Sequence, residues 1–334
     1  MKEAVRFAVA ALIVTSCAPC KRKDGELVHR VVLIGGFRRA ADGELVGSRS
    51  VVAFDHATRR VVDYGAILEK PLYGSASVSH AASGRLVLTG GIDTDSGSTS
   101  RKTFLVDVDG RLERAADRPT DDTYLQKIAT IGDNVYVCAG HSRRGQSRAC
   151  HRYSVTDDAW MALESASLPK TFEGTTNVMT SDGARYLYLV TTEFEREQRA
   201  ISRPGRVDRQ IRDVQGGTFV SGPEPSLIVC GPRPPNFGIG CDYLPIEAAS
   251  ESGWLKGPDW SERHSLLSHL HIVQCDGQLL ALAKGVLYAT APRPVRRLRD
   301  ISGEWETLVV DVKEQYDVLL STAACHPVPA DKLE

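Results

Sequence analysis

The chain has 334 residues with 41 basic and 42 acidic side chains, so its formal net charge at pH 7 is −1. This near balance produces no net field that attracts nucleic acid or an anionic membrane, and we expect no nucleic-acid partner. The length fits either one large β domain or two ordinary domains. Eight cysteines are many for a reducing cytosol and few for a disulfide-dominated scaffold, so the compartment has to be inferred from other features.

The first twenty residues, MKEAVRFAVAALIVTSCAPC, have the pattern of an export signal. Lys2 and Arg6 precede an apolar run that is too short to span a bilayer as a mature helix. The end of this run, from Val14 to Cys17, resembles the lipobox of bacterial lipoproteins, in which the cysteine is lipidated and becomes the first residue. We therefore expect residues 1–16 to be a lipoprotein signal peptide and Cys17 to be the lipidation site. A plain secretory signal that is cleaved nearby is the alternative.

Residues 17–27 are polar and are interpreted as a tether between the anchor and a soluble body. The residue after the anchor is Ala18, whereas Asp at that place is the usual inner-membrane retention signal of enteric lipoproteins. We therefore expect a cell-envelope location, on the periplasmic side or at the outer membrane. No later segment approaches 18 uninterrupted apolar residues, so the lipid is the expected membrane contact.

Short β-rich runs recur along the rest of the chain, and most of them end in small residues. Their starts lie roughly 40 to 55 residues apart, which is a period typical of propeller blades. Most of these runs are preceded by another β-rich run that closes on a Gly or Asp turn. They are followed by a longer loop and then by two further strands. Four strands per repeat without helical periodicity indicate a β-propeller. The runs are RVVLIGG (30–36), RLVLTGG (85–91), NVYVCAG (134–140), RYLYLVT (185–191), SLIVCG (226–231) and QLLALAKG (278–285).

These repeats resemble the kelch repeat, which has an apolar strand, a Gly pair, an aromatic residue in the third strand and a Trp in the fourth. The resemblance implies an all-β, six-bladed kelch-like propeller over residues 28–326, with residues 327–334 as a tail. It is uneven, because repeat four has neither the Gly pair nor the Trp. The matching residues are the pairs Gly35–Gly36 and Gly90–Gly91, the pair Tyr153 and Trp160, and, with an aliphatic residue in place of the aromatic, Leu298 and Trp305.

Counting strands predicts how the ring closes. The first repeat begins directly at its second strand, and a surplus strand over residues 316–324 follows the last repeat. We expect this C-terminal strand to complete the first blade as its innermost member. Closure of this kind removes exposed sheet edges and ties the two chain ends together.

The sequence VYVCAGH, residues 135–141, raises the question whether Cys138 and His141 bind a metal. A metal site needs three or four converging ligands, and His151 is the one further candidate nearby. In the propeller register Cys138 ends a second strand and Cys150 opens the third strand, so the two face each other as disulfide partners do. We therefore expect a disulfide, no metal site and no other cofactor.

The same placement recurs in the fifth repeat, where Cys230 and Cys241 flank the corresponding loop. An exported protein meets an oxidising environment, so both loops are expected to be closed by disulfides at their base. Cys275 and Cys325 fall on the inner strands of neighbouring blades, where a third bridge can form.

Because strands alternate in direction, the loops from second to third strands and those between blades share one face, here called the long-loop face. These loops are rich in Arg, which suits carboxylates, sulfates and phosphates. Aromatic residues beside charged ones recur where each inner strand begins, as in a sugar or peptide site. The alternative for the Arg residues is that they only solubilise the loops. The alternative for the aromatic residues is that their rings pack between blades. The candidate ligand-binding residues are Arg38, Arg39, Lys70, Tyr73, Asp121, Tyr124, Arg143, Arg144, Phe172, Glu173, Arg263 and His264.

The sequence favours a lipid-anchored propeller that acts, without catalysis, as a binding or scaffold module for a protein, peptide or anionic glycan. The alternative is an extracytoplasmic carbohydrate enzyme, because bacterial sialic-acid mutarotases are exported six-bladed kelch proteins of comparable size. An enzyme is expected to show a concave pocket with two carboxylates or a His pair such as His269 and His271, with shifted pKa values. A binding module is expected to show a broad Arg-rich surface.

Overall fold

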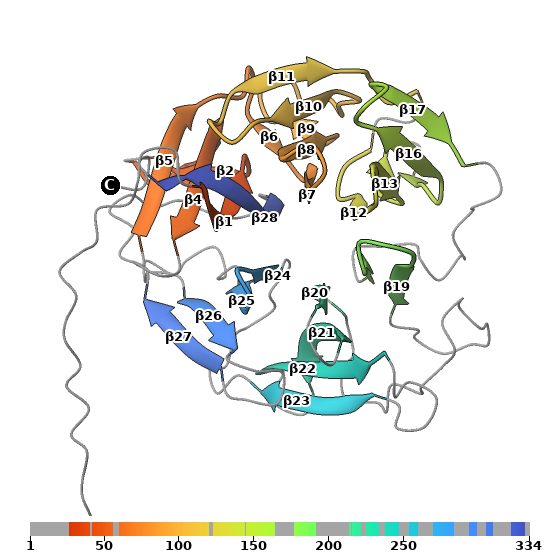
Figure 1. Cartoon of the computed structure of the whole chain (residues 1–334). Helices are drawn as coiled ribbons and strands as arrows, with labels where there is room; N and C mark the ends of the chain where they lie inside the picture. The colour runs from red at the N-terminus through yellow and green to blue at the C-terminus, as the bar shows by residue number, and fades with distance from the viewer. Residues whose placement is uncertain are drawn as a thin grey trace, which may run out of the picture.

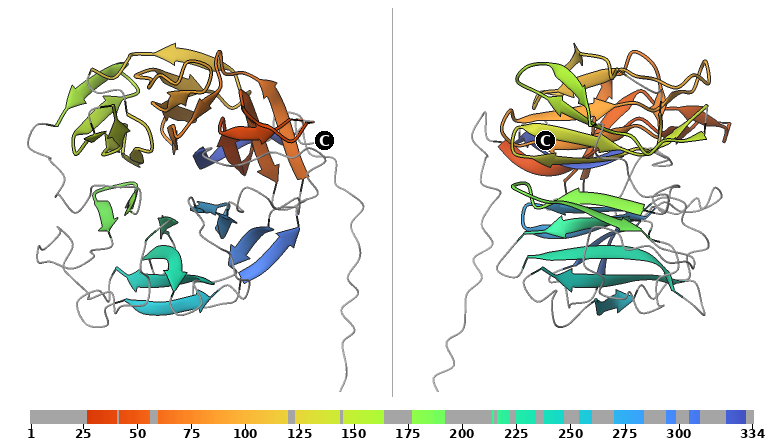
Figure 2. Two further views of the ribbon diagram at one scale, coloured as in Figure 1. Left: turned by 180° about the vertical axis from the view of Figure 1, so that it is seen from behind. Right: turned by 90° about the vertical axis from the view of Figure 1, so that its right-hand side faces the viewer.

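In the computed structural model, six β-sheets surround a central axis (Figures 1 and 2). Five of the sheets have four described strands, and the fourth sheet along the chain has two. This is the predicted six-bladed β-propeller. The structure describes residues 27–40, 42–55, 60–119, 123–143, 145–163, 177–191, 214, 216–221, 225–233, 238–246, 254–259, 270–283, 294–298, 305–309 and 322–330.

The blades are numbered in chain order, and their strands run outward from the central axis. Blade one consists of β28 (Thr322–Pro329), β1 (Leu27–Ile34), β4 (Ser50–Asp55) and β5 (Arg60–Ala66). Blade two consists of β7 (Ala76–His80), β8 (Arg85–Thr89), β10 (Thr103–Val106) and β11 (Leu112–Ala115). Blade three consists of β12 (Lys127–Ile131), β13 (Asn134–Cys138), β16 (Cys150–Ser154) and β17 (Ala159–Ala162).

The second half of the ring continues the same order. Blade four is described by β18 (Asn177–Ser181) and β19 (Leu187–Thr191). Blade five consists of β20 (Gly216–Val220), β21 (Ser226–Arg233), β22 (Gly238–Pro245) and β23 (Leu255–Asp259). Blade six consists of β24 (Leu270–Cys275), β25 (Gln278–Ala283), β26 (Pro294–Leu298) and β27 (Trp305–Val309).

Three short two-stranded sheets lie on the long-loop face, in the loops that follow the second strands of blades one, two and three. Two of them are hairpins within one such loop, and the third joins a loop to the segment that enters the same blade. They are β2 (Phe37–Arg39) with β3 (Leu45–Gly47), β14 (His141–Ser142) with β15 (Gly145–Gln146), and β6 (Leu72–Tyr73) with β9 (Ile92–Asp93).

The hydrophobic core lies between neighbouring blades. Ile34 and Val51 of blade one pack against Leu86 and Leu88 of blade two, and all four side chains are buried. Side chains alternate between the two faces of a blade, and in blade one each face packs against one of the two neighbouring blades. The inner strands of consecutive blades contact one another around the whole ring.

The Gly pairs allow the chain that enters the next blade to approach closely. The Gly36 N–H donates a hydrogen bond to the Leu72 carbonyl at 2.7 Å, and the Gly91 N–H donates to the Thr123 carbonyl at 3.1 Å. Gly35 has a φ of 64°, and a Cβ atom there would clash with the same Leu72 carbonyl. Glycine is therefore required at this crossing.

The aromatic spacing is also confirmed. Tyr153 of β16 lies directly opposite Trp160 of β17, with ring centroids 4.9 Å apart. The Trp160 indole N–H donates to the Ala116 carbonyl at 3.0 Å, which ties the outer strand of blade three to the end of blade two. Leu298 and Trp305 occupy the same register positions in blade six. Tyr153 and Trp160 therefore stabilise the fold by packing between strands and blades.

The C-terminal strand closes the ring as predicted, but it lies further along the chain than residues 316–324. β28 pairs with β1 from Leu27 opposite Pro329 to Ile34 opposite Thr322. The expected tail over residues 327–334 is therefore wrong for its first residues, which belong to this strand. The strand accommodates Pro327 and Pro329 because β28 pairs on one side only, and an edge strand tolerates Pro.

Cys17, the signal peptide and the tether up to residue 26 lie outside the described residues. Within the described ranges, no helix has the length and apolar character needed to cross a membrane.

Candidate functional site

Two loops of the long-loop face are closed by disulfides. Cys138 lies opposite Cys150 in the β13–β16 register, and Cys230 lies opposite Cys241 in the β21–β22 register. Both pairs are bonded, with Cα atoms 4.1 Å apart in each. The Cys138 sulfur therefore bonds to sulfur and not to a metal. In the described part of the chain, no group of three metal-ligating side chains comes together.

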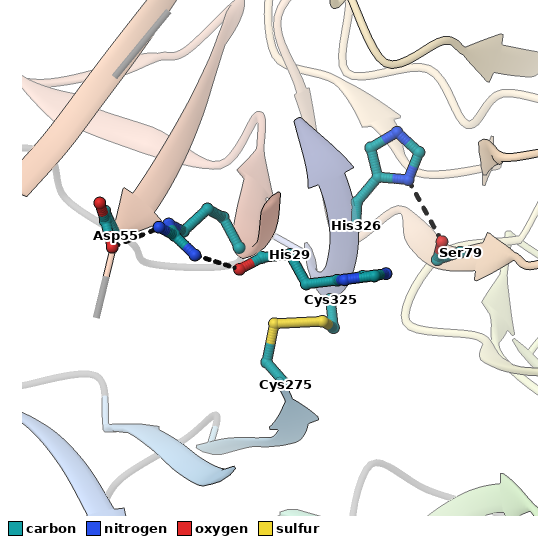
Figure 3. The surroundings of a disulfide bond; sticks show 7 residues. His29, Asp55, Ser79, Cys275, Cys325 and His326 are labelled. Atoms are coloured by element: carbon teal, nitrogen blue, oxygen red, sulfur yellow. Dashed lines mark hydrogen bonds and ion pairs between the residues drawn. A yellow bond between two sulfur atoms is a disulfide. The ribbon is translucent and has the colours of Figure 1, made fainter. Parts of the chain in front are cut away.

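A third disulfide joins Cys275 of blade six to Cys325 of blade one, which Figure 3 shows beside His326. On the other side of β28, Ser77 and Thr322 share a hydrogen bond of 2.8 Å, and Ser79 and the His326 Nδ1 share one of 3.2 Å. The closing strand is thus fixed to both neighbouring blades. Three disulfides indicate an oxidising, extracytoplasmic compartment.

Four half-buried side chains form two ring pairs on the long-loop face. Phe37 packs against Tyr73 with ring centroids 5.1 Å apart, and Tyr124 packs against His141 at 5.6 Å. Phe37 and His141 each follow the small residues that end a second strand, and Tyr73 and Tyr124 each precede an inner strand. The elements of three blades therefore bring these rings to one face, and we call the four residues the aromatic row.

The two ring pairs are neighbours. Burial raises the pKa of the Tyr73 hydroxyl, and the Tyr124 hydroxyl raises it further. The Leu125 N–H donates a hydrogen bond to the Gly74 carbonyl at 2.6 Å, so the segments that carry Tyr73 and Tyr124 lie side by side and the two pairs form one row from blade one to blade three. A row of half-exposed rings at the long-loop face can stack against an apolar or planar part of a ligand.

A cavity of about 730 Å³ occupies the central channel, and inner strands of all six blades line it. Gly74, Leu125 and Lys127 line it toward the long-loop face, because they lie at the starts of blades two and three. Hydroxyl groups from other blades, among them Thr180 and Thr218, line its walls. The channel is therefore polar and large enough for a small ligand.

Two nitrogen bases meet at the blade-three side of this opening. Burial lowers the pKa of the Lys127 ammonium to about 8. Burial also lowers the pKa of His141, and the nearby Lys127 charge lowers it further. Both shifts have the sign expected for cations held away from water.

A second cavity, of about 270 Å³, lies on the long-loop face between the segment that enters blade two and the β9–β10 loop. Lys70 and Asp93 form an ion pair in its wall, with Nζ and Oδ2 2.7 Å apart. Burial on its own raises the pKa of Asp93. The Lys70 and Ser96 side chains and the backbone N–H groups of Asp95 and Ser96 outweigh it, and the pKa falls to about 2.

We expect Lys70→Met to raise the pKa of Asp93 from about 2, because the change removes the hydrogen bond and the positive charge that oppose the effect of burial. The unfolded-state pKa is near 3.8, so the stability from this pair is present above about pH 4 and is lost as the pH falls toward 2. Carboxyl carbon NMR titration measures the shift. Lys102→Met is the control, because Lys102 pairs with Glu69 instead. An unchanged Asp93 titration in Lys70→Met would contradict this prediction.

The structure brings some predicted site residues together and leaves others untested. Tyr73 and Tyr124 belong to the aromatic row, Lys70 lines the smaller cavity, and Arg143 is exposed in the β14–β15 turn. Arg38 and Arg39 lie in β2 on the same face. The rest of the predicted set lies outside the described residues: Asp121, Arg144, Phe172, Glu173, Arg263 and His264.

Sequence reasoning missed Phe37 and Lys127 and considered His141 only as a metal ligand. Phe37 and His141 occupy equivalent positions directly after the small residues of their repeats, and this equivalence was the available signal. Lys127 begins an inner strand. Its burial depends on the neighbouring blades, and the sequence around Lys127 does not show it.

Among the described residues, one carboxylate and two histidines, His29 and His271, line the channel. Asp182 is its carboxylate, and its Oδ1 accepts hydrogen bonds from the backbone N–H groups of Ala184, Arg185 and Tyr186. His271 lines the channel, whereas His269 lies outside the described residues.

No family model matches this chain, and no curated protein matches it. Among solved structures, that of YjhT is similar, with 12% sequence identity, a TM-score of 0.41, and coverage of 82% of this chain and 80% of that one. A likeness at this level carries no argument about activity, so function has to be inferred from the site itself.

Proposed function

We propose that this chain is a lipid-anchored extracytoplasmic binding module that holds a protein, peptide or anionic glycan on its long-loop face. The observation that carries the proposal is the aromatic row, which crosses three blades with half-exposed rings. Rigid rings offer contact area at low entropic cost, and the strands beneath them hold them in place.

Charge and loop structure support the same proposal. The Cys138–Cys150 disulfide closes the loop that carries His141. A loop that is constrained before binding loses less conformational entropy when a ligand binds to it. Arg143 is exposed in that loop, and Arg38 and Arg39 lie in β2 beside Phe37. Arginine in segments that also carry aromatic residues suits a ligand that combines acidic and apolar parts.

The test uses the mature full chain, immobilised through its N-terminal end and exposed to a random peptide library and a glycan array. Ligands that are enriched on the parent chain are then measured against the double variant Tyr73→Ala/Tyr124→Ala. We expect affinity to fall at least about tenfold, because removing an anchoring aromatic typically costs more than 1.4 kcal/mol.

Tyr186→Ala is the matched control. Tyr186 is 59% exposed and lies in the β18–β19 turn, on the face opposite the long loops. Binding that survives the row variant unchanged, or that falls equally in the control, would refute a ligand site on the aromatic row.

A further inference from the structure

We propose that the Cys275–Cys325 disulfide is a thiol-exchange site, at which a small dithiol that enters the central channel opens the seam between blades six and one. The site is separate from the aromatic row, and the proposal does not depend on a ligand there. It rests on two observations, the access to Cys325 from the channel and the position of the bond across the seam.

The three disulfides differ in their access to solvent. Cys325 is half-buried and lines the channel cavity of about 730 Å³, whereas its partner Cys275 is 1% exposed. The cysteines of the other two bridges are buried, with exposed fractions of 3% for Cys138, 4% for Cys150 and 0% for both Cys230 and Cys241. None of these four described cysteines lines the channel. A small reagent in the channel therefore reaches the seam disulfide first, and it does so through Cys325.

The alternation of side chains along β28 accounts for this orientation. Ala324 packs into the core between blades one and two, and Cys325 packs against the core between blades one and six. Figure 3 shows Cys325 on β28 bonded to Cys275 on β24. Residues of both strands line the channel, so the disulfide joins two segments of the channel wall.

The exchange reaction balances with the dithiol as reductant. One thiolate of the dithiol attacks the Cys325 sulfur, a new S–S bond forms, the Cys275–Cys325 bond breaks, and Cys275 leaves as a thiolate. The second thiolate of the reagent then attacks its own sulfur in the mixed disulfide and releases Cys325. The protein disulfide gains two electrons and two protons, and the dithiol is oxidised to a disulfide.

Reduction removes a covalent link at a seam that is otherwise held by packing. On the blade-six side of blade one, Val31 and Leu33 pack with Leu280 around the disulfide. On the blade-two side, β28 stays attached through the Ser77 and Ser79 hydrogen bonds. Loss of the bond therefore loosens β24 from β28 and leaves the joint between blades one and two intact.

The experiment treats the mature full chain with limiting dithiothreitol at neutral pH, followed by alkylation and peptide mapping with mass spectrometry. We expect Cys275 and Cys325 to be alkylated at least about tenfold faster than Cys138 and Cys150, because a buried disulfide reacts only after local opening. In denaturant the access is equal, and the difference should shrink below about threefold. Equal rates in the native protein, or slower alkylation of the seam pair, would overturn the proposal.

Two double variants provide the matched controls. Cys138→Ser/Cys150→Ser should keep the fast phase, and Cys275→Ser/Cys325→Ser should lose it. Reduced glutathione is the second probe, because an acid quench traps the mixed disulfide, which we expect on Cys325 and not on Cys275. A mixed disulfide on Cys275 would refute the route through the channel, and a fast phase that persists without the seam pair would assign the exchange to another disulfide.

Hydrogen exchange measures the opening of the seam. In chain that is reduced and alkylated at Cys275 and Cys325, the amides of β24 and β28 should exchange faster than in the oxidised chain, while those of β13 and β16 keep their rates. Unchanged exchange in β24 and β28 would show that the bond does not hold the seam. A uniform rise in all blades would mean global unfolding, and either result would overturn the proposal.

Discussion

Replacing both Cys275 and Cys325 with serine is expected to lower the free energy of unfolding by about 4 kcal/mol, because this disulfide closes a long loop. The two cysteines are 50 residues apart in sequence and join blade six to blade one. Their loss leaves β28 attached to its neighbours through β1 and through the Ser77 and Ser79 hydrogen bonds. Urea unfolding monitored by tryptophan fluorescence and circular dichroism measures the change.

The matched control replaces Cys138 and Cys150, whose sequence separation is 12. The shorter loop predicts a loss of about 3 kcal/mol, and this bridge lies within one blade rather than between two. The prediction would be contradicted if the two double variants lost the same free energy of unfolding, or if the Cys138 and Cys150 variant lost more. Loop length would then not decide how much each disulfide stabilises the ring.

Asp55→Ala is expected to lower the free energy of unfolding by roughly 3 to 5 kcal/mol, since it leaves the buried Arg30 charge without its carboxylate. The Arg30 Nε and the Asp55 Oδ1 are 2.8 Å apart, and their side chains are 3% and 0% exposed. The Arg30 Nη1 also donates to the His29 carbonyl at 2.7 Å, so the guanidinium has a fixed position near the start of β1. Chemical denaturation of the purified variant measures the loss.

The exposed pair between Arg85 and Glu113 is the control for this experiment. Its atoms are 3.0 Å apart, but the side chains are 34% and 55% exposed, so water screens the pair. Glu113→Ala should cost less than about 1 kcal/mol. A comparable loss in both variants would mean that burial of the ion pair contributes little.

The repeat in the sequence predicted most of the fold, because each blade buries its strands in the same way. The alternation of apolar residues, the turns and the Gly pairs predicted the four-strand units, and the position of the cysteines predicted two disulfides that the structure contains. The bounds of the closing strand were wrong. Pro327 and Pro329 disfavour a central strand, and local sequence does not show that a strand will lie at an edge.

The site was less predictable, since it depends on which side chains of different blades meet. Tyr73 and Tyr124 recur at the start of inner strands, and this recurrence predicted them. Their partners Phe37 and His141 follow the second strands, and each pair lies far apart in sequence. The lowered pKa of Lys127 also arises from burial that the ring creates, so no local pattern around the residue indicates it.

β28 joins the last described residues to the first strand, so blade one is built from the two ends of the described chain. β1, β4 and β5 emerge first, and the inner edge of this sheet stays unpaired until residues 322–329 are available. Such pairing has a high contact order, which slows folding and prolongs exposure of an apolar strand edge. Blade one therefore cannot form its complete sheet until residues 322–329 are available, and until then the free edge of β1 can pair with other chains.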